Sequence, residues 1–372
     1  MEPERRYALD ALLDALGLPF DEGAPATADE LDGVFALLTL AHERDAELDE
    51  HGRPLPPEVS PAPRVAEVAA ELGKRLGLER RGYAGGERFL VALTHDVDLL
   101  GVGGFPSALR KLTGGVVLGS GRRLREGTAF LLDALARRDP AFRLDEMGPP
   151  STCFFLAQQE DPHDGYPQRY RPALSRALQQ ASADGREIGL HASYRSREHE
   201  GAISEEAQAL AKSVPSNTVL QGLRHHYLRS APERLAAELR AAGLQYDSSI
   251  GWASRPGLRA GTPYPYRLWD PERRKPGAWE LPLALMDATL AEERYLGLDA
   301  EAAFEVAVET LEPVAEHGGA VAILWHSPSH HPRLSRGYDR LYRRLLDWIE
   351  QRGGRTGTAA ETLERWHARR VN

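Results

Sequence analysis

The chain has 372 residues, a length that allows one large domain with a small companion and a sizeable core. Its net charge of −9 does not suit nonspecific binding to nucleic acid. The single cysteine, Cys153, excludes an internal disulfide and a zinc site built from several thiolates. No stretch of about 18 apolar residues predicts a membrane span, and the charged residues 1–6 lead into no apolar segment. We therefore expect a soluble cytoplasmic protein with no membrane span and no nucleic-acid partner.

Residues 1–85 predict a small, mainly helical N-terminal region. Apolar residues recur at helical spacing within 7–50, for example at Leu9, Leu12, Leu13 and Leu16. A proline-rich stretch at 53–64 interrupts this pattern, and a short helix is expected at about 65–76. This region offers no cluster of catalytic side chains.

Residues 86–372 predict a catalytic domain in which strands alternate with helices. The strands are expected at 89–93, 152–156, 187–190, 222–224, 246–248, 279–283 and 320–325. Helices are expected between them, for example at 170–183, 232–242, 301–312 and 339–352. Strands separated by helices favour a parallel α/β sheet, and about seven such units suit a closed or nearly closed (β/α) barrel. An open doubly wound sheet is the alternative that spacing leaves open.

Two carboxylates follow the first predicted strand of this domain. Thr94, Asp96 and Asp98 come at the end of an apolar run, where an α/β fold gathers its functional side chains. At positions i and i+2 of an extended chain, the two carboxylates point the same way and repel each other. A metal ligand beside a general base would relieve that repulsion. The alternative is a helix N-cap with a spare carboxylate.

Three further predicted strands also end on ionisable side chains. His191 ends one strand, Arg224 and its neighbours His226 and Tyr227 end the next, and His326 ends the last. A single histidine at such a place is more often a hydrogen-bonded core group than a ligand. Four strand ends of this kind are hard to explain by packing, since buried titratable groups are costly and collect at functional sites.

The order of these motifs carries a family resemblance. Thr-x-Asp-x-Asp, Gly-Leu-His, Arg-x-x-Tyr and Leu-x-His follow one another from residue 94 to residue 326. Over about residues 89–365 the chain resembles the polysaccharide deacetylase family, the carbohydrate esterases with a NodB-type domain. The resemblance implies a distorted (β/α) barrel that holds one divalent metal ion, with zinc expected, and that hydrolyses an N- or O-acetyl group.

The resemblance also implies a metal site with one departure from the family pattern. Asp96 matches the general base that deprotonates the water at the metal, Asp98 matches a metal ligand, and His191 matches the first histidine of the family's His-x-x-x-His motif. The second histidine of that motif is replaced by Arg195. We expect His226 to supply the missing ligand, with other histidines as weaker alternatives: His199, His95 and His225.

The remaining roles are likewise implied by the resemblance. Arg224 matches the arginine that orients the base, and Tyr227 the residue whose backbone N–H helps hold the oxyanion. His326 matches the histidine that protonates the leaving group. For the carboxylate that orients His326, we expect Asp247 first and Asp287 second.

The function expected is removal of an acetyl group, more readily N-linked than O-linked, from an amino sugar or glycan precursor. The alternatives are hydrolysis of another linear or cyclic amide on the same scaffold, and a catalytically silent domain that binds glycans or partners. Residues 251–277 are rich in Trp, Tyr and Arg, which suit sugar stacking, so this segment is expected to cover the substrate. Burial of Trp252 and Trp269 away from His191 would favour the alternative, a segment packed by its own aromatics.

Overall fold

The computed structural model describes residues 1–57, 63–78 and 80–369. The predictions for residues 58–62, 79 and 370–372 lie outside the described residues. Its centre is one curled sheet in the order β6-β7-β5-β4-β3-β2-β1-β9-β8, with β10 paired to β1. Every pairing in the described sheet is parallel except that of β6 with β7. The strands are β1 (Phe89–Val97), β2 (Thr152–Leu156), β3 (Glu187–Ala192), β4 (Gly222–His225), β5 (Tyr246–Asp247), β6 (Tyr266–Asp270), β7 (Lys275–Glu280), β8 (Leu283–Met286), β9 (Ala320–Leu324) and β10 (Gly354–Gly357).

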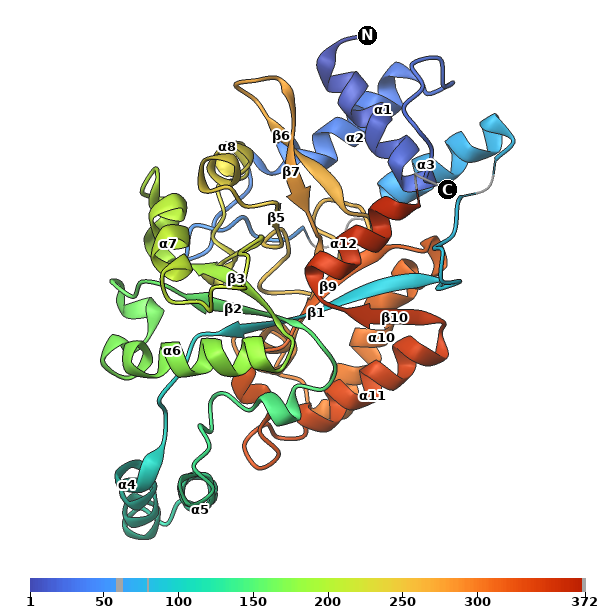
Figure 1. Cartoon of the computed structure of the whole chain (residues 1–372). Coiled ribbons are helices and arrows are strands. Elements are labelled where there is room, and N and C mark those ends of the chain that lie inside the picture. The colour runs from blue at the N-terminus through green and yellow to red at the C-terminus, as the bar shows by residue number, and fades with distance from the viewer. Residues whose placement is uncertain (58–62, 79, 370–372) are drawn as a thin grey trace.

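Helices surround this sheet, and two of them project from the body of the molecule (Figure 1). The predicted distorted α/β barrel is confirmed. Among the described residues, no helix combines the length and apolar character needed to cross a bilayer. The α-helices are α1 (Pro3–Leu16), α2 (Ala28–Leu38), α3 (Arg64–Leu76), α4 (Gly104–Val117), α5 (Gly121–Leu135), α6 (Pro167–Ala183), α7 (Ala202–Ala211), α8 (Pro232–Ala242), α9 (Asp287–Ala291), α10 (Ala300–His317), α11 (Tyr338–Gln351) and α12 (Ala359–Ala368).

Most predicted strands lie where the apolar runs place them, and the exceptions have physical reasons. The predicted strand at 279–283 is divided between β7 and β8, and Pro282 between them has no N–H for a ladder hydrogen bond. Strands β6 and β10 were not predicted, because Tyr266–Asp270 lies in the segment that was expected to cover the substrate and Gly354–Gly357 contains no large apolar side chain. Helices α4 and α5 were also missed.

Strand β1 positions the first part of the site. All nine of its residues are buried, because β2, β9 and β10 pair with it. Near its carboxyl end, the Thr94 hydroxyl donates to the Ile323 carbonyl at 2.8 Å, and His95 Nδ1 lies 2.9 Å from the Trp325 carbonyl. These bonds hold the end of β1 against β9, where the acidic residues begin.

The N-terminal helices share their core with the sheet. Buried leucines of α1, α2 and α3 belong to the same apolar cluster as residues of β2, β3 and β4. The Trp366 indole of α12 donates to the Asp14 carboxylate at 2.9 Å, and the Tyr7 hydroxyl donates to the Arg267 carbonyl at 2.5 Å. The predicted boundary at residue 85 stays a prediction, since these contacts join the two regions closely.

The prediction that residues 251–277 cover the substrate is wrong. Trp252 is 5% exposed and lies against Arg259, whose guanidinium pairs with Glu43 at 2.7 Å. Trp269 packs against Tyr7 and Phe35, with ring centroids 5.2 and 5.4 Å away. A cavity opens beside His226 and His326 at the carboxyl edge of the sheet, and the described residues that line it include none from 251–277. The aromatic side chains of this segment join the sheet to the N-terminal helices instead.

Replacing Trp252 with Ala should therefore lower the free energy of unfolding by about 3 kcal/mol, because it leaves a cavity in a buried site. Urea unfolding of the variant measures this change. The exposed substitution Val219→Ala is the control and should change stability by no more than about 0.5 kcal/mol. A Trp252→Ala variant of normal stability with a raised Michaelis constant would restore the substrate-covering role.

Candidate active site and metal centre

The ionisable strand ends meet at one edge of the sheet. Asp98 follows β1, His191 lies in β3, His226 follows β4, and His326 follows β9. Because β1 to β4 and β9 run parallel, their carboxyl ends bring these side chains together. This is the arrangement that the sequence predicts.

Asp98, His191 and His226 form a compact cluster of possible metal ligands. Asp98 Oδ1 lies 3.1 Å from His191 Nε2 and 3.8 Å from His226 Nε2. One ligand atom from each residue lies within 4.8 Å of the other two. That spacing allows all three atoms to reach a single ion.

Both imidazoles are held with the same nitrogen toward the cluster. His191 Nδ1 lies 2.9 Å from the Arg224 carbonyl, and His226 Nδ1 lies 2.8 Å from Asp164 Oδ1. Asp164 is itself buried and accepts from the Tyr194 N–H at 2.8 Å. Metal-binding histidines are commonly oriented in this way, by a carbonyl or carboxylate on the other ring nitrogen.

The donor set fits a divalent ion. Asp98 Oδ1 and His191 Nε2 are buried and face each other at 3.1 Å, and neither has another hydrogen-bond partner among the described residues, which is costly unless another group satisfies them. Burial favours a neutral Asp98, but the imidazoles of His191, His226 and His326 lower its pKa below the usual value. An ionised carboxylate with two imidazole nitrogens is a ligand set typical of catalytic zinc.

The structure also distinguishes among the histidines considered for the third ligand. Arg195, at the position of the missing family histidine, is exposed and pairs with Asp161 at 2.9 Å. His199 is exposed, His95 lies beside β9, and His225 lies 3.2 Å from the Ser196 hydroxyl. Of the four candidates, His226 is the one within the cluster.

Asp96 lies between the cluster and a buried arginine. Its Oδ2 is 3.7 Å from His191 Nε2, and its Oδ1 is 3.7 Å from Arg224 Nη1. Arg224 is fully buried, and its Nη2 donates to the hydroxyls of Thr94 at 3.2 Å and Ser248 at 3.1 Å. These hydroxyls fix the guanidinium beside Asp96.

His326 lies beside Asp98. Its Nε2 is 3.7 Å from Asp98 Oδ2, and its Nδ1 is 2.6 Å from Asp287 Oδ1. The backbone N–H of His326 also donates to Asp287 Oδ2 at 3.1 Å. Burial lowers the pKa of His326, but the Asp287 carboxylate outweighs it and raises the pKa to about 10. The imidazole is thus protonated at neutral pH.

The prediction that Asp247 orients His326 is wrong, and Asp287, the second choice, takes this position. Asp247 ends β5, which four strands separate from β9, whereas β8 is paired to β9 and ends just before Asp287. The carboxylate of Asp247 accepts instead from the Ser249 hydroxyl at 2.7 Å and from the Ser249 N–H at 2.8 Å. Burial raises the pKa of Asp247.

Tyr227 lies at the rim of the site in a strained backbone conformation. Its φ is 59° and that of Leu228 is 57°, values that side chains with a Cβ rarely adopt. The Tyr227 carbonyl accepts from Arg53 Nη1 at 2.9 Å, and Arg53 also pairs with Asp49 at 2.6 Å. Arg53 further donates to the Tyr295 hydroxyl at 3.3 Å. The N-terminal region therefore supplies a side chain to the site.

A cavity of about 390 Å³ opens over this cluster. Its floor contains Asp96, Asp98, His226 and His326. Its walls come from several segments and include Arg53, His163, Gly165, Met286, Arg294 and Tyr295. The volume suits a small-molecule ligand.

No family model matches the sequence, and the search of curated proteins finds no match. A solved structure from Mycobacterium smegmatis, named as a polysaccharide deacetylase, is similar over 78% of this chain and 94% of its own, with 18% identity and a TM-score of 0.51. The chain has the polysaccharide deacetylase fold. A Pseudomonas aeruginosa structure named in the same way has 16% identity, coverage of 77% and 93%, and a TM-score of 0.47. A structure named Puue allantoinase has 15% identity, coverage of 77% and 92%, and a TM-score of 0.47.

Two residues of this polysaccharide deacetylase fold were not anticipated from the sequence. Asp164 follows no predicted strand, yet it orients His226. Arg53 lies in the N-terminal region, 174 residues before the Tyr227 carbonyl that it contacts. An acidic residue in the loop after β2 was a weak signal for the first, and the sequence held no signal for the second.

Proposed function

We propose that the chain is a divergent, metal-dependent member of the polysaccharide deacetylase family. In this proposal it removes an acetyl group, N-linked in preference to O-linked, from an amino sugar or a glycan precursor. The observation that carries the proposal is the convergence of Asp98, His191 and His226, with Asp96 beside His191 and His326 beside Asp98. A cytoplasmic location stays a prediction.

The side chains can carry the proton transfers of amide hydrolysis. When bound, a divalent ion, zinc in this proposal, polarises the acetyl carbonyl and lowers the pKa of a neighbouring water. Asp96, which lies 3.7 Å from Arg224 Nη1, accepts the proton of the attacking water. His326, kept protonated by Asp287, donates a proton to the departing nitrogen. The backbone at Tyr227 is the proposed contact for the oxyanion.

The preference for an N-linked acetyl group rests on His326. An amine leaves readily only when its nitrogen is protonated, and His326 holds a proton at the edge of the cavity. The walls offer polar contacts suited to sugar hydroxyls, among them Arg53, Arg294 and Tyr295.

Acetate release from a panel of N-acetylated amino sugars, with metal analysis of the same preparation, tests this function. Asp96→Asn should keep the metal and lose turnover by about 10² or more, the usual scale of proton-transfer catalysis. Near-normal turnover of this variant would remove Asp96 from the mechanism. The panel should also contain O-acetylated sugars and cyclic ureides. Preferred hydrolysis of a ureide would replace the proposed substrate, and ligand binding without any hydrolysis would show a silent domain.

A further inference from the structure

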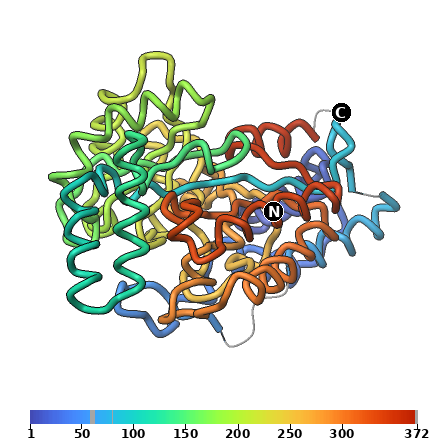
Figure 2. Tube along the Cα trace, turned by 90° about the horizontal axis from the view of Figure 1, so that it is seen from below, coloured from blue at the N-terminus to red at the C-terminus, as the bar shows by residue number. Residues whose placement is uncertain are grey.

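Helices α4 and α5 form a hairpin that projects from the body of the molecule (Figures 1 and 2). The two helices pack closely through small residues. A Cβ added to Gly115 would meet Leu124 at 2.8 Å, and one added to Gly127 would meet Leu112 at 2.8 Å. The hairpin therefore holds itself together and presents its outer surface to the surroundings.

That outer surface is unusually apolar for an exposed element. Of the fourteen large hydrophobic side chains exposed among the described residues, seven lie on this hairpin. The greatest exposure is at its tip, at 73% for Val116, 81% for Val117 and 62% for Leu118. The other four are Phe105, Leu109, Leu132 and Leu135. A concentration of this kind marks an interaction surface.

The same segment is strongly basic. Residues 104–138 contain seven arginines or lysines and two acidic residues, a net charge of +5 in a chain whose net charge is −9. Arg122, Arg123 and Arg125 lie just after the apolar tip and are exposed, as is Arg110 on the facing helix. The partner of this surface should thus be both apolar and negatively charged.

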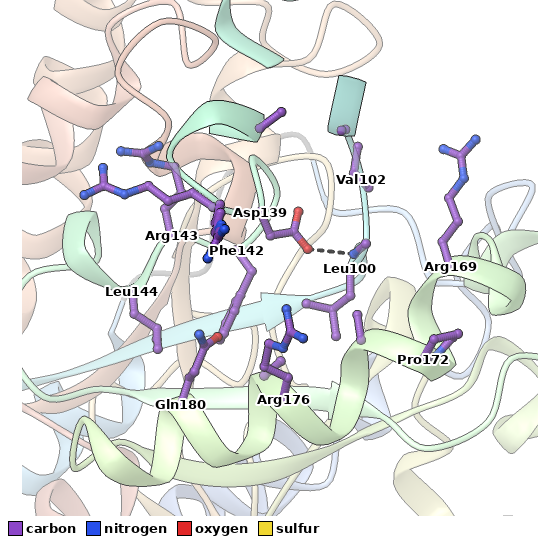
Figure 3. Close-up of a pocket in the computed structure, with 18 of the residues that line it drawn as sticks. Leu100, Val102, Asp139, Phe142, Arg143, Leu144, Arg169, Pro172, Arg176 and Gln180 are labelled. Carbon is purple, nitrogen blue, oxygen red and sulfur yellow. Dashed lines mark hydrogen bonds between the residues drawn. The ribbon is translucent and has the colours of Figure 1, made fainter. Parts of the chain in front are cut away.

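Positive charge continues into a groove at the foot of the hairpin. This groove has a volume of about 1110 Å³ and lies between α6 and residues 100–105 and 134–145 (Figure 3). Arg137, Arg169 and Arg176 line it, and within the described residues none of the three has a carboxylate partner. The Asp139 carboxylate in the same groove accepts from the Gly101 N–H at 2.6 Å and from the Ala141 N–H at 3.0 Å. Guanidinium groups without a carboxylate partner suit phosphate oxygens.

We propose that this hairpin docks the protein on an anionic lipid bilayer. Val116, Val117 and Leu118 enter the interface between headgroups and acyl chains, and the surrounding arginines contact lipid phosphates. The apolar tip matches the acyl chains of such a bilayer, and the basic residues beside the tip match its negatively charged headgroups. A second copy of the chain fits less well, because two segments 104–138, each with a net charge of +5, would repel each other.

Docking of this kind would bring the catalytic cavity near the bilayer. The hairpin begins six residues after Asp98, at the same edge of the sheet as the site. The docking itself does not depend on the proposed function, since it is measured by binding.

Co-sedimentation of the full chain with lipid vesicles tests the proposal. The protein should sediment with vesicles of 70% phosphatidylcholine and 30% phosphatidylglycerol, and at least tenfold less with phosphatidylcholine alone. Val116→Asp/Val117→Asp and Arg122→Glu/Arg123→Glu should each reduce binding to the anionic vesicles at least tenfold. All four side chains are exposed, so circular dichroism should show a normal fold.

Matched controls carry the same chemical changes elsewhere on the surface. Leu78→Asp/Val219→Asp and Lys212→Glu/Arg340→Glu replace exposed residues and should bind as the unchanged protein does. No sedimentation with anionic vesicles would overturn the proposal, and so would equal losses in test and control variants. Light scattering distinguishes the remaining case: a dimer that the tip substitutions dissociate would identify a second copy as the partner.

Discussion

Replacing His226 with Ala should remove most of the bound metal, whereas replacing Arg195 with Ala should leave the metal in place. His226 Nε2 lies 3.8 Å from Asp98 Oδ1 within the ligand cluster, while Arg195 is exposed and pairs with Asp161. A site with three protein ligands loses most of its affinity when one of them is lost. Elemental analysis of the purified proteins, followed by titration with zinc, measures the effect.

Further variants sharpen this metal prediction. Asp98→Ala and His191→Ala should also lose the metal, since both belong to the cluster. Asp164→Asn, which weakens the orientation of His226 and can also disturb the bond from the Tyr194 N–H, should lower the affinity by about 10- to 100-fold. If His226→Ala kept one ion per chain, the assignment of the third ligand would be wrong.

The position of the site could be predicted because it depends on local sequence. Asp96, Asp98, His191 and His326 each follow an apolar run, and parallel strands with helical connections bring such ends to one edge. The structure brings these residues together around a cluster that includes His226. The prediction that these side chains meet at one edge did not require the order of the strands in the sheet.

The partners of these residues could not be predicted because they do depend on strand order. Asp247 and Asp287 both lie near strand ends, and the sequence does not show that β8 rather than β5 pairs with β9. Asp164 and Arg53 act across contacts between distant segments, which periodicity does not reveal. The prediction for residues 251–277 was wrong for the same reason. Their aromatic side chains suit sugar binding and packing equally well, and the sequence does not show which residues they contact.

The second prediction concerns the contact between His326 and Asp287. Asp287→Asn should reduce kcat by about 10² or more, the scale for loss of a positioned general acid, with the Michaelis constant little changed. The amide removes the charge that keeps the imidazole protonated, and its single oxygen can accept only one of the two hydrogen bonds from His326. Steady-state kinetics of acetate release, together with metal analysis, separates this loss from damage to the metal site.

Asp247→Asn is the matched control, because it makes the same change in a buried carboxylate that bonds to Ser249 instead. Its kcat should stay within about threefold of the unchanged enzyme, since a substitution outside the site removes no interaction made in the transition state. Equal losses of kcat in the two variants would mean that burial of charge, and not contact with His326, governs both effects. A larger loss in Asp247→Asn than in Asp287→Asn would contradict the assignment of Asp287, because the 2.6 Å contact with His326 Nδ1 would then have no role in turnover.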